Sequence, residues 1–202
     1  LVLQVNDPLH GLERLRGVEG RRRLLGVQQF TAVLPVANQE GVVTGLALDE
    51  SVNLAFGPND DGYVRVQSID FPDEEYFHID QVPPMIPTYW GNYLRGAVLS
   101  LENSFKLRRG INAVIQGKLP IGGLSSSAAV TTAYLMALAA VNELEVSPEA
   151  LIQFSHWVER EFIGLNNGIL DQAANILSRE GYLMHMDCQT GVSKMVPRSE
   201  KM

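Results

Sequence analysis

Apolar residues in the first third of the chain occur in short runs that glycine, asparagine and aspartate interrupt. The runs Ala32–Ala37, Gly41–Leu48 and Val52–Phe56 predict β-strands joined by tight turns. The segment Gly57–Gly62 has the residue types of a hairpin turn, and Tyr63–Ile69 alternates as a half-buried strand does. The first third is therefore predicted to be mostly sheet.

The apolar pattern changes to helical spacing further along the chain. Asp70–Pro87 is rich in proline and predicts an irregular connection, whereas Trp90–Leu101 has the spacing of an amphipathic helix. Gly110–Gln116 predicts another strand. Ser127–Leu144 is rich in alanine, leucine and methionine and lacks glycine and proline, so it predicts a long helix.

Ser147 followed by Pro148 is a typical helix start, with a serine cap and proline in the first turn. The helix is expected to continue to about Ile163. Asp171–Ser178 predicts a further helix, and Gly181–Asp187 predicts a strand. Strands come mostly first and helices later, without regular alternation, which favours an α+β fold with helices on one face of a mixed sheet. No linker divides residues 1–202, so a single domain is predicted.

Composition narrows the possible partners. The formal net charge is −7, and the one basic cluster is Arg21–Arg23, so a nucleic-acid-binding surface is not expected. The only cysteine is Cys188, which excludes a disulfide within the chain. No apolar run reaches the roughly 18 residues of a membrane span. The sequence predicts a cytoplasmic protein without a membrane partner.

Leu119–Ala129 is the segment that carries the strongest chemical signal. Its glycines and serines lie between a predicted strand and a long helix, where unpaired backbone N–H groups and the helix dipole attract anions. It lacks the Gly-Lys-Ser/Thr of the common P-loop, and a serine-rich helix cap is the structural alternative. The residues predicted to bind nucleotide phosphates are Gly122, Gly123, Leu124, Ser125, Ser126, Ser127 and Ala128.

Pro120–Ala129 resembles the nucleotide-binding motif of the GHMP kinase superfamily. Three further segments resemble galactokinases within that superfamily: Trp90–Gly96 (Trp-x-Asn-Tyr-x-x-Gly), Glu159–Gln172 (Glu-x-x-Tyr/Phe-Val-Gly-x-x-x-Gly-Ile-Met-Asp-Gln) and Met186–Gln189 (Leu/Ile-Asp-Cys-Arg). The four motifs follow one another in the same order. The resemblance implies the amino-terminal lobe of such a kinase, with a fold like the second domain of ribosomal protein S5.

The resemblance also implies roles for single residues. Asp171 would lie against the anomeric hydroxyl of a sugar as base or orienting acceptor, next to a sugar contact at Gly168. Ser127 and Glu159 would hold Mg²⁺. Glu161 is a second candidate for this ligand, and the alternative for Glu161 is that it is a surface charge. Arg21 would stabilise the transferred charge.

The amino-terminal region departs from the galactokinase pattern. Gly20–Gly26 aligns with Gly-Arg-x-Asn-Leu-Ile-Gly, and Val33–Pro35 aligns with Val-Leu-Pro. Between them, the Glu-His-Thr-Asp-Tyr stretch that holds sugar hydroxyls is absent, and Val27–Phe30 stands in its place. A different acceptor, a loss of activity or residues missing from the sequence would each account for this difference.

The expected function is ATP-dependent phosphorylation of the anomeric hydroxyl of galactose or a related sugar, with ATP and Mg²⁺. Two alternatives remain: a catalytically silent sensor of sugar and nucleotide, and a kinase for another sugar, such as arabinose or a uronic acid. Members of the superfamily continue into a carboxy-terminal lobe, and no such lobe is found in residues 1–202. That lobe is therefore an expected partner of this chain.

Overall fold

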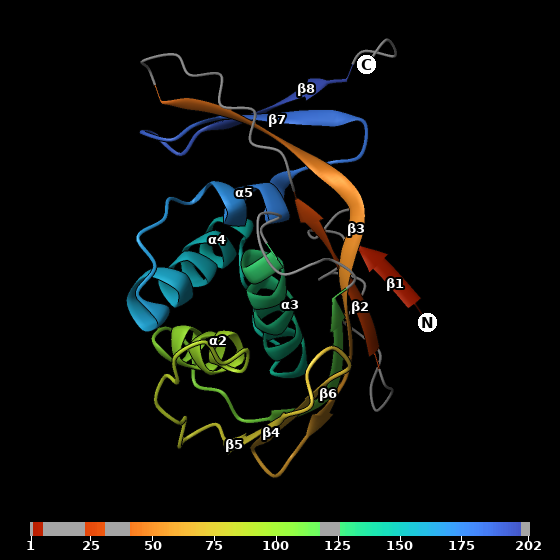
Figure 1. The fold of residues 1–202 in the computed structure, drawn as a ribbon, viewed down its shortest axis with the longest axis vertical. Helices are drawn as coiled ribbons and strands as arrows, with labels where there is room; N and C mark the ends of the chain where they lie inside the picture. Colours follow the sequence, from red (N-terminus) through yellow and green to blue (C-terminus); the bar gives the residue numbers. More distant parts are fainter. Residues whose placement is uncertain (1, 6–22, 31–40, 118–125, 199–202) are drawn as a thin grey trace.

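The computed structural model describes residues 2–5, 23–30, 41–117 and 126–198. Its strands are β1 (Val2–Val5), β2 (Arg23–Phe30), β3 (Val42–Asn59), β4 (Tyr63–Ser68), β5 (Glu74–His78), β6 (Gly110–Gly117), β7 (Tyr182–Asp187) and β8 (Ser193–Pro197). Its helices are α2 (Asn92–Glu102), α3 (Ser126–Val141), α4 (Pro148–Trp157), the π-helix η1 (Val158–Ile163) and α5 (Leu170–Leu177) (Figure 1).

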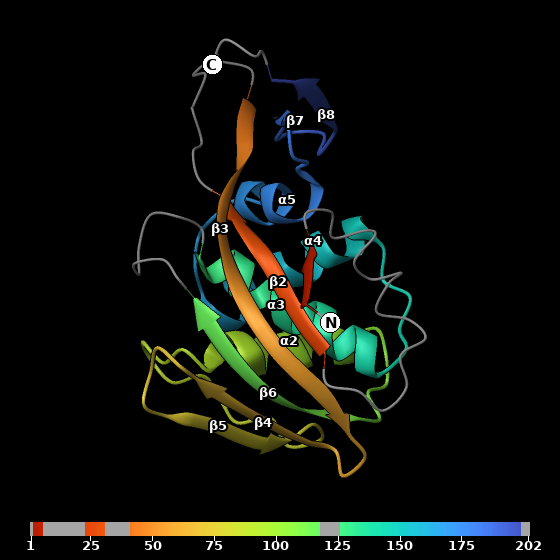
Figure 2. The same cartoon turned by 90° about the vertical axis from the view of Figure 1, so that its right-hand side faces the viewer.

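A mixed sheet forms one layer of the molecule. Its strand order is β1-β2-β3-β6-β4-β5, and β7 with β8 extends it from the amino-terminal part of β3. The pairs β1–β2 and β4–β6 are parallel, and the others are antiparallel. Helices α2, α3, α4 and α5 lie against one face of this sheet (Figures 1 and 2). The predicted α+β fold is confirmed.

The core lies between the sheet and α3. In β6, Ile111, Ala113 and Ile115 are buried, whereas Val114 on the opposite face is 39% exposed. Helix α3 is apolar on nearly all sides, and its residues from 133 to 139 are fully buried. A helix without a polar face must be enclosed by other elements, and the sheet and the neighbouring helices enclose α3. The predicted long helix is therefore confirmed as the centre of the fold.

Helix α4 begins as the sequence predicts. The hydroxyl of Ser147 accepts a hydrogen bond from the backbone N–H of Ala150 at 3.2 Å, and Pro148 occupies the first turn. The helix then changes at Val158 into the π-helix η1, which ends at Gly164 with a φ of 85°. Only glycine adopts this left-handed conformation at little cost. A π-helical turn is rare and occurs often at functional sites.

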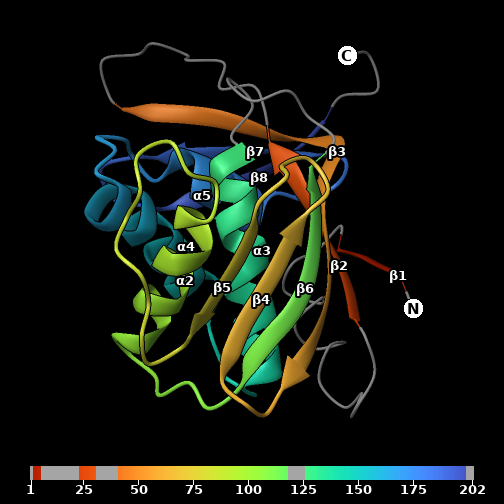
Figure 3. The same ribbon diagram turned by 60° about the horizontal axis from the view of Figure 1, so that its bottom comes forward.

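Two predictions about turns are wrong. Residues 42–59 form one continuous strand, so there is no turn between Leu48 and Val52. The Gly57–Gly62 segment does reverse the chain, but β3 and β4 are not paired with each other, because β6 lies between them (Figure 3). Turn composition predicts that the chain reverses, whereas tertiary packing decides which strands become neighbours. The predicted run Ala32–Ala37 lies outside the described residues.

The predicted irregular connection Asp70–Pro87 is also wrong in part, since it contains β5. This strand pairs with β4, and it alternates between exposed and buried positions. Its two buried side chains are Glu75 and Phe77, which are 2% and 4% exposed. A carboxylate at a buried position hides the alternation of a strand, because sequence patterns count it as polar.

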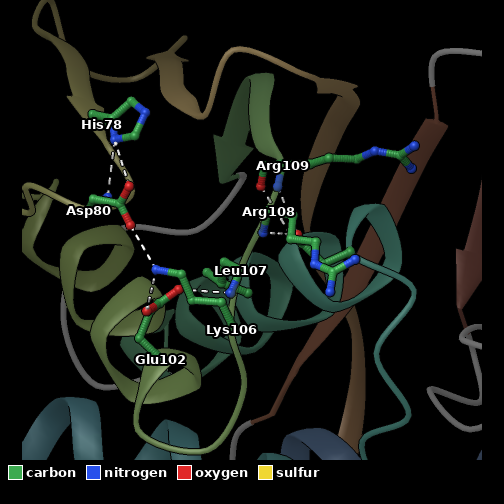
Figure 4. Close-up of polar contacts among 8 residues, drawn as sticks. His78, Asp80, Glu102, Lys106, Leu107, Arg108 and Arg109 are labelled. Carbon is green, nitrogen blue, oxygen red and sulfur yellow. Dashed lines mark hydrogen bonds and ion pairs between the residues drawn. The ribbon is translucent and has the colours of Figure 1, made fainter.

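An exposed charge network joins the end of β5 to the connection between α2 and β6 (Figure 4). Lys106 Nζ lies 2.8 Å from Asp80 Oδ1 and 3.6 Å from Glu102 Oε2, and the backbone N–H of Leu107 donates to Glu102 Oε1 at 2.7 Å. Lys106 lowers the pKa of the Asp80 carboxyl through a hydrogen bond and its positive charge. Every carboxylate in this network therefore has a partner within the protein.

Candidate functional site

The predicted phosphate-binding segment leads into the first turn of α3. Within the described residues it starts at Ser126, and Ser126 and Ser127 are half-buried while Ala128 is buried. The start of an α-helix presents unpaired backbone N–H groups, so this turn has the chemistry that an anion requires. The other predicted residues lie outside the described part of the chain: Arg21, Gly122, Gly123, Leu124 and Ser125.

The π-helix η1 separates the two carboxylates that sequence analysis considered for the metal. Glu159 is 1% exposed. The Glu161 side chain is 57% exposed, and Arg160 Nε lies 3.4 Å from its Oε1. Glu161 therefore has the environment of an ordinary surface charge. Glu159 is a buried carboxylate, and its burial requires an explanation.

Neutral amides surround the Glu159 carboxylate. Gln172, from the first turn of α5, donates from Nε2 to Glu159 Oε2 at 2.6 Å. The side-chain amide of Asn167 donates to the same oxygen. Within the described part of the chain, Glu159 Oε1 has no hydrogen-bond partner and the carboxylate forms no ion pair. One oxygen is thus held twice, and the other is buried without a partner among the described residues.

Tyr93 of α2 connects this carboxylate to the start of α3. Burial raises the pKa of the half-buried Tyr93, and the Glu159 charge raises it further, while a hydrogen bond with the Ser127 side chain opposes the shift. Both groups must lie near the tyrosine hydroxyl for these effects to act. Ser127 and Glu159, the two predicted metal ligands, therefore both act on Tyr93.

In the Trp-Gly-Asn-Tyr motif, the glycine and the asparagine hold the start of α2, and this positions Tyr93. A side chain at Gly91 would collide with Glu75 and Tyr89, so only glycine allows this close approach. The amide of Asn92 accepts from the N–H of Ile86 and donates to its carbonyl oxygen, which anchors the preceding loop. These contacts fix the start of α2 against its surroundings. Sequence analysis matched the motif to a family without explaining it.

Asp171 lies in the first turn of α5, where it is half-buried. The cap position of α5 is Ile169 and has no side-chain cap, so Asp171 does not serve as the cap. Among the described residues, its carboxylate has no hydrogen-bond or ion-pair partner. Gly168 is exposed, and a Cβ built there meets nothing within 4 Å. Both residues adjoin Gln172 and Asn167, which hold Glu159.

Two histidines, His156 and His185, lie in different parts of the molecule. His185 Nδ1 lies 3.0 Å from the Thr44 hydroxyl, away from the carboxylate cluster. His156 lies next to the cluster, because its Nε2 is 3.1 Å from the backbone oxygen of Asn167. Gln172 was noted in the sequence only as the last residue of the Glu159–Gln172 motif, without a predicted role. For Asn167 the sequence indicated a turn or a contact with the sugar, and the contact with Glu159 was not predicted.

The cluster is compatible with Mg²⁺, which needs few protein ligands. No group of three or more histidine, cysteine, aspartate or glutamate side chains with metal-site geometry occurs among the described residues. Mg²⁺ usually takes one or two carboxylates and completes its shell with water and phosphate oxygens. A buried carboxylate oxygen without a partner among the described residues, together with a serine hydroxyl that acts on the same tyrosine, is suited to such an ion.

Comparison with known proteins places this architecture in a family. Residues 92–179 match the GHMP kinases N terminal domain. The structure superposes on the *Lactococcus lactis* galactokinase complexed with galactose with a TM-score of 0.82 at 24% identity, covering 94% of this chain and 50% of that one. Residues 92–179 thus match the amino-terminal domain of GHMP kinases, and the fold of the chain is similar to that of a galactokinase.

Curated relatives refine this assignment. An *Arabidopsis thaliana* galacturonokinase is 38% identical over 82% of this chain and 43% of its own length. A *Roseiflexus* galactokinase is 33% identical over 78% of this chain and 40% of its own length. The chain is thus similar to sugar kinases of the galactokinase type, and it spans somewhat less than half of the length of these relatives. No helix in the described residues is both long and apolar enough to cross a membrane.

Proposed function

We propose that the full-length protein is an ATP-dependent kinase that phosphorylates the anomeric hydroxyl of a sugar with the configuration of galactose. The observation that carries this proposal is the buried Glu159, with one oxygen held by two amides and the other unpartnered near Ser127. Similarity to a galacturonokinase and to galactokinases supports the sugar as acceptor. ATP is the proposed phosphoryl donor, in keeping with the superfamily.

The proposed chemistry divides among three groups of residues. The N–H groups of the first turn of α3, together with Gly122–Ser125, would bind the nucleotide phosphates. Ser127 and Glu159 would hold Mg²⁺, which neutralises charge on the phosphate oxygens when it is bound. Arg21 would stabilise charge on the transferred group, as the family resemblance implies.

Asp171 would act on the acceptor. Its carboxylate, without a partner in the described structure, would accept the proton of the anomeric hydroxyl as that oxygen forms a bond to the γ-phosphorus and ADP leaves. Gly168 leaves open space beside it in which a sugar could approach the backbone. The family resemblance implies these roles, and the positions and chemistry of the two residues support them.

We propose a uronic acid, galacturonic acid, as the preferred acceptor over galactose. The galacturonokinase relative has a higher identity over a larger part of this chain than the *Roseiflexus* galactokinase. Val27–Phe30, which replaces the acidic stretch of galactokinases, has no carboxylate, and its backbone belongs to β2. A site with fewer protein carboxylates repels a sugar carboxylate less.

The test is an ADP-release assay of the full-length protein with galacturonic acid, galactose and arabinose. We expect the highest kcat/KM with galacturonic acid. A preference for galactose would contradict the uronic acid as the acceptor, while the proposed kinase activity would remain supported. Binding of Mg·ATP without turnover of any sugar would favour the silent sensor, which the absent acidic stretch supports and the presence of Ser127, Glu159 and Asp171 opposes.

A further inference from the structure

The Glu159 carboxylate lies in a setting that does not favour a charged group by itself. It is 1% exposed, and it forms no ion pair with another described residue. A buried charge is costly unless a counter-charge or several hydrogen bonds compensate it. Among the described residues, the only hydrogen bonds that compensate this charge are those to Oε2, from two neutral amides. Oε1 is left without a partner among the described residues.

The two amides come from different elements and converge on one oxygen. Gln172 is fully buried in α5, and Asn167 lies in the loop between η1 and α5. Since each donates its N–H group to Glu159, the carbonyl oxygen of each amide points elsewhere. Both carbonyl oxygens are buried without a partner among the described residues. The cluster thus contains three buried oxygen atoms that lack a donor, on Glu159, Asn167 and Gln172.

His156 adds a second restraint on Asn167. Its Nε2 lies 3.1 Å from the Asn167 backbone oxygen, so a residue one helical turn before Glu159 fixes the loop that carries the amide. The Asn167 side chain is therefore held at both ends, at its backbone by His156 and at its amide by Glu159. This arrangement limits the directions in which the Glu159 carboxylate can turn.

From this geometry we propose that Asn167 and Gln172 are positioning residues for the divalent cation of the proposed kinase. They fix Oε2 of Glu159 so that Oε1 is presented to the cation beside Ser127. Their own unpartnered carbonyl oxygens are available to accept hydrogen bonds from its water ligands. Asn167 is a variable position of the resembled motif, so this role is not part of the family pattern quoted above. The inference rests on the proposed function.

The experiment measures cation affinity separately from activity. Full-length wild-type protein is compared with Gln172→Met and Asn167→Ala, and with Asn166→Ala as the matched control, since Asn166 is an exposed neighbour in the same loop. Electron paramagnetic resonance gives the affinity for Mn²⁺ at saturating ADP. Calorimetry gives the affinity for ADP in EDTA, where no divalent cation is available.

We expect Gln172→Met and Asn167→Ala to weaken Mn²⁺ binding by about 10- to 100-fold, the usual effect of removing a group that orients a metal ligand. ADP affinity in EDTA and the Asn166→Ala variant should remain at the wild-type level. Mn²⁺ affinity within about twofold of wild type in both variants would overturn the inference. An equal loss of ADP affinity with and without metal would also overturn it, because that result indicates a structural role.

The wild-type measurement separates this inference from the proposed function. If wild-type protein binds Mn·ADP and phosphorylates a sugar while both variants retain their cation affinity, the positioning role is wrong and the kinase stands. If wild-type protein binds no Mn·ADP, the proposed function itself fails, and the positioning role fails with it.

Discussion

Two buried carboxylates in this molecule have opposite surroundings. Glu75 of β5 is 2% exposed, and Arg95 of α2 donates to its two oxygens from Nε at 2.8 Å and from Nη2 at 3.1 Å. Glu159 is 1% exposed and has only neutral amides from the described residues as partners. Among the described residues, the first charge is balanced by a counter-charge, and the second is not.

The difference separates a structural role from a functional one. The guanidinium of Arg95 also donates to the Pro84 carbonyl oxygen at 2.6 Å, so the Glu75 pair ties β5, α2 and the loop between them together. A buried pair of this kind holds elements in register. A buried carboxylate without a counter-charge is instead suited to a cation that comes from outside the chain. We therefore read Glu159 as part of the site and Glu75 as part of the scaffold.

Asp171 is the third carboxylate in this comparison, and its loss should have the largest effect. Replacing Asp171 by Asn keeps the shape and removes the proposed proton acceptor. We expect kcat to fall by about 10²- to 10⁴-fold, in the range for a lost general base, with nearly unchanged ATP affinity. Steady-state kinetics with the preferred sugar and calorimetry with ATP measure the two quantities. Wild-type turnover in this variant would show that Asp171 has no part in the chemistry.

The second prediction concerns the balanced pair of Glu75 and Arg95. Replacing Arg95 by Met removes the counter-charge and leaves Glu75 buried alone. The free energy of unfolding should fall by about 3–5 kcal/mol, the usual cost of removing one partner of a buried pair. Urea denaturation measures this change. Arg65→Met, which breaks the partly exposed Asp61 pair, serves as the control and should have little effect. Equal effects of the two variants would contradict the scaffold role of Arg95.

The same two carboxylates show where sequence reasoning succeeds and where it fails. Helix α3 and the Ser147 cap were predictable because apolar periodicity and capping are local properties. Strand β5 was missed because Glu75 is polar in sequence and buried in space, and its partner Arg95 lies 20 residues away. A local pattern does not contain a partner at that distance.

The candidate site divides in a similar way. The positions of Ser127 and Glu159 in motifs suggested that they work together, and the structure brings them near Tyr93. The contact of Asn167 with Glu159 could not be predicted, because it depends on the loop folding back so that the amide reaches η1. The motif favoured Glu159 over Glu161, and the tertiary structure adds that Glu159 is buried whereas Glu161 is exposed.

The third prediction removes the unbalanced charge. Replacing Glu159 by Gln should raise the free energy of unfolding of the metal-free protein by about 1–3 kcal/mol, because a buried charge without a counter-charge disappears. Cation binding should be lost in the same variant. Thermal denaturation in EDTA and in Mg·ADP measures both effects. A loss of stability as large as that of Arg95→Met would show that Glu159 is already compensated within the protein.

The last prediction concerns the alkaline limit of the Glu75 region. Burial, followed by the hydrogen bond to Glu75 and the charge of that carboxylate, raises the pKa of Tyr89 to about 12. In the unfolded chain a tyrosine ionises near pH 10. Because the folded state disfavours the ionised ring, this contribution to stability is complete below about pH 10 and is lost as the pH rises toward 12. Since Tyr89 is partly exposed, we expect a loss of only about 1 kcal/mol over this interval.

The Tyr89→Phe variant should lack this loss of unfolding free energy at alkaline pH. The Tyr182→Phe variant, at an exposed position, should retain it. Urea denaturation at several pH values measures the difference. If the free energy of unfolding falls equally with pH in wild type and Tyr89→Phe, Tyr89 is not coupled to the pair of Glu75 and Arg95.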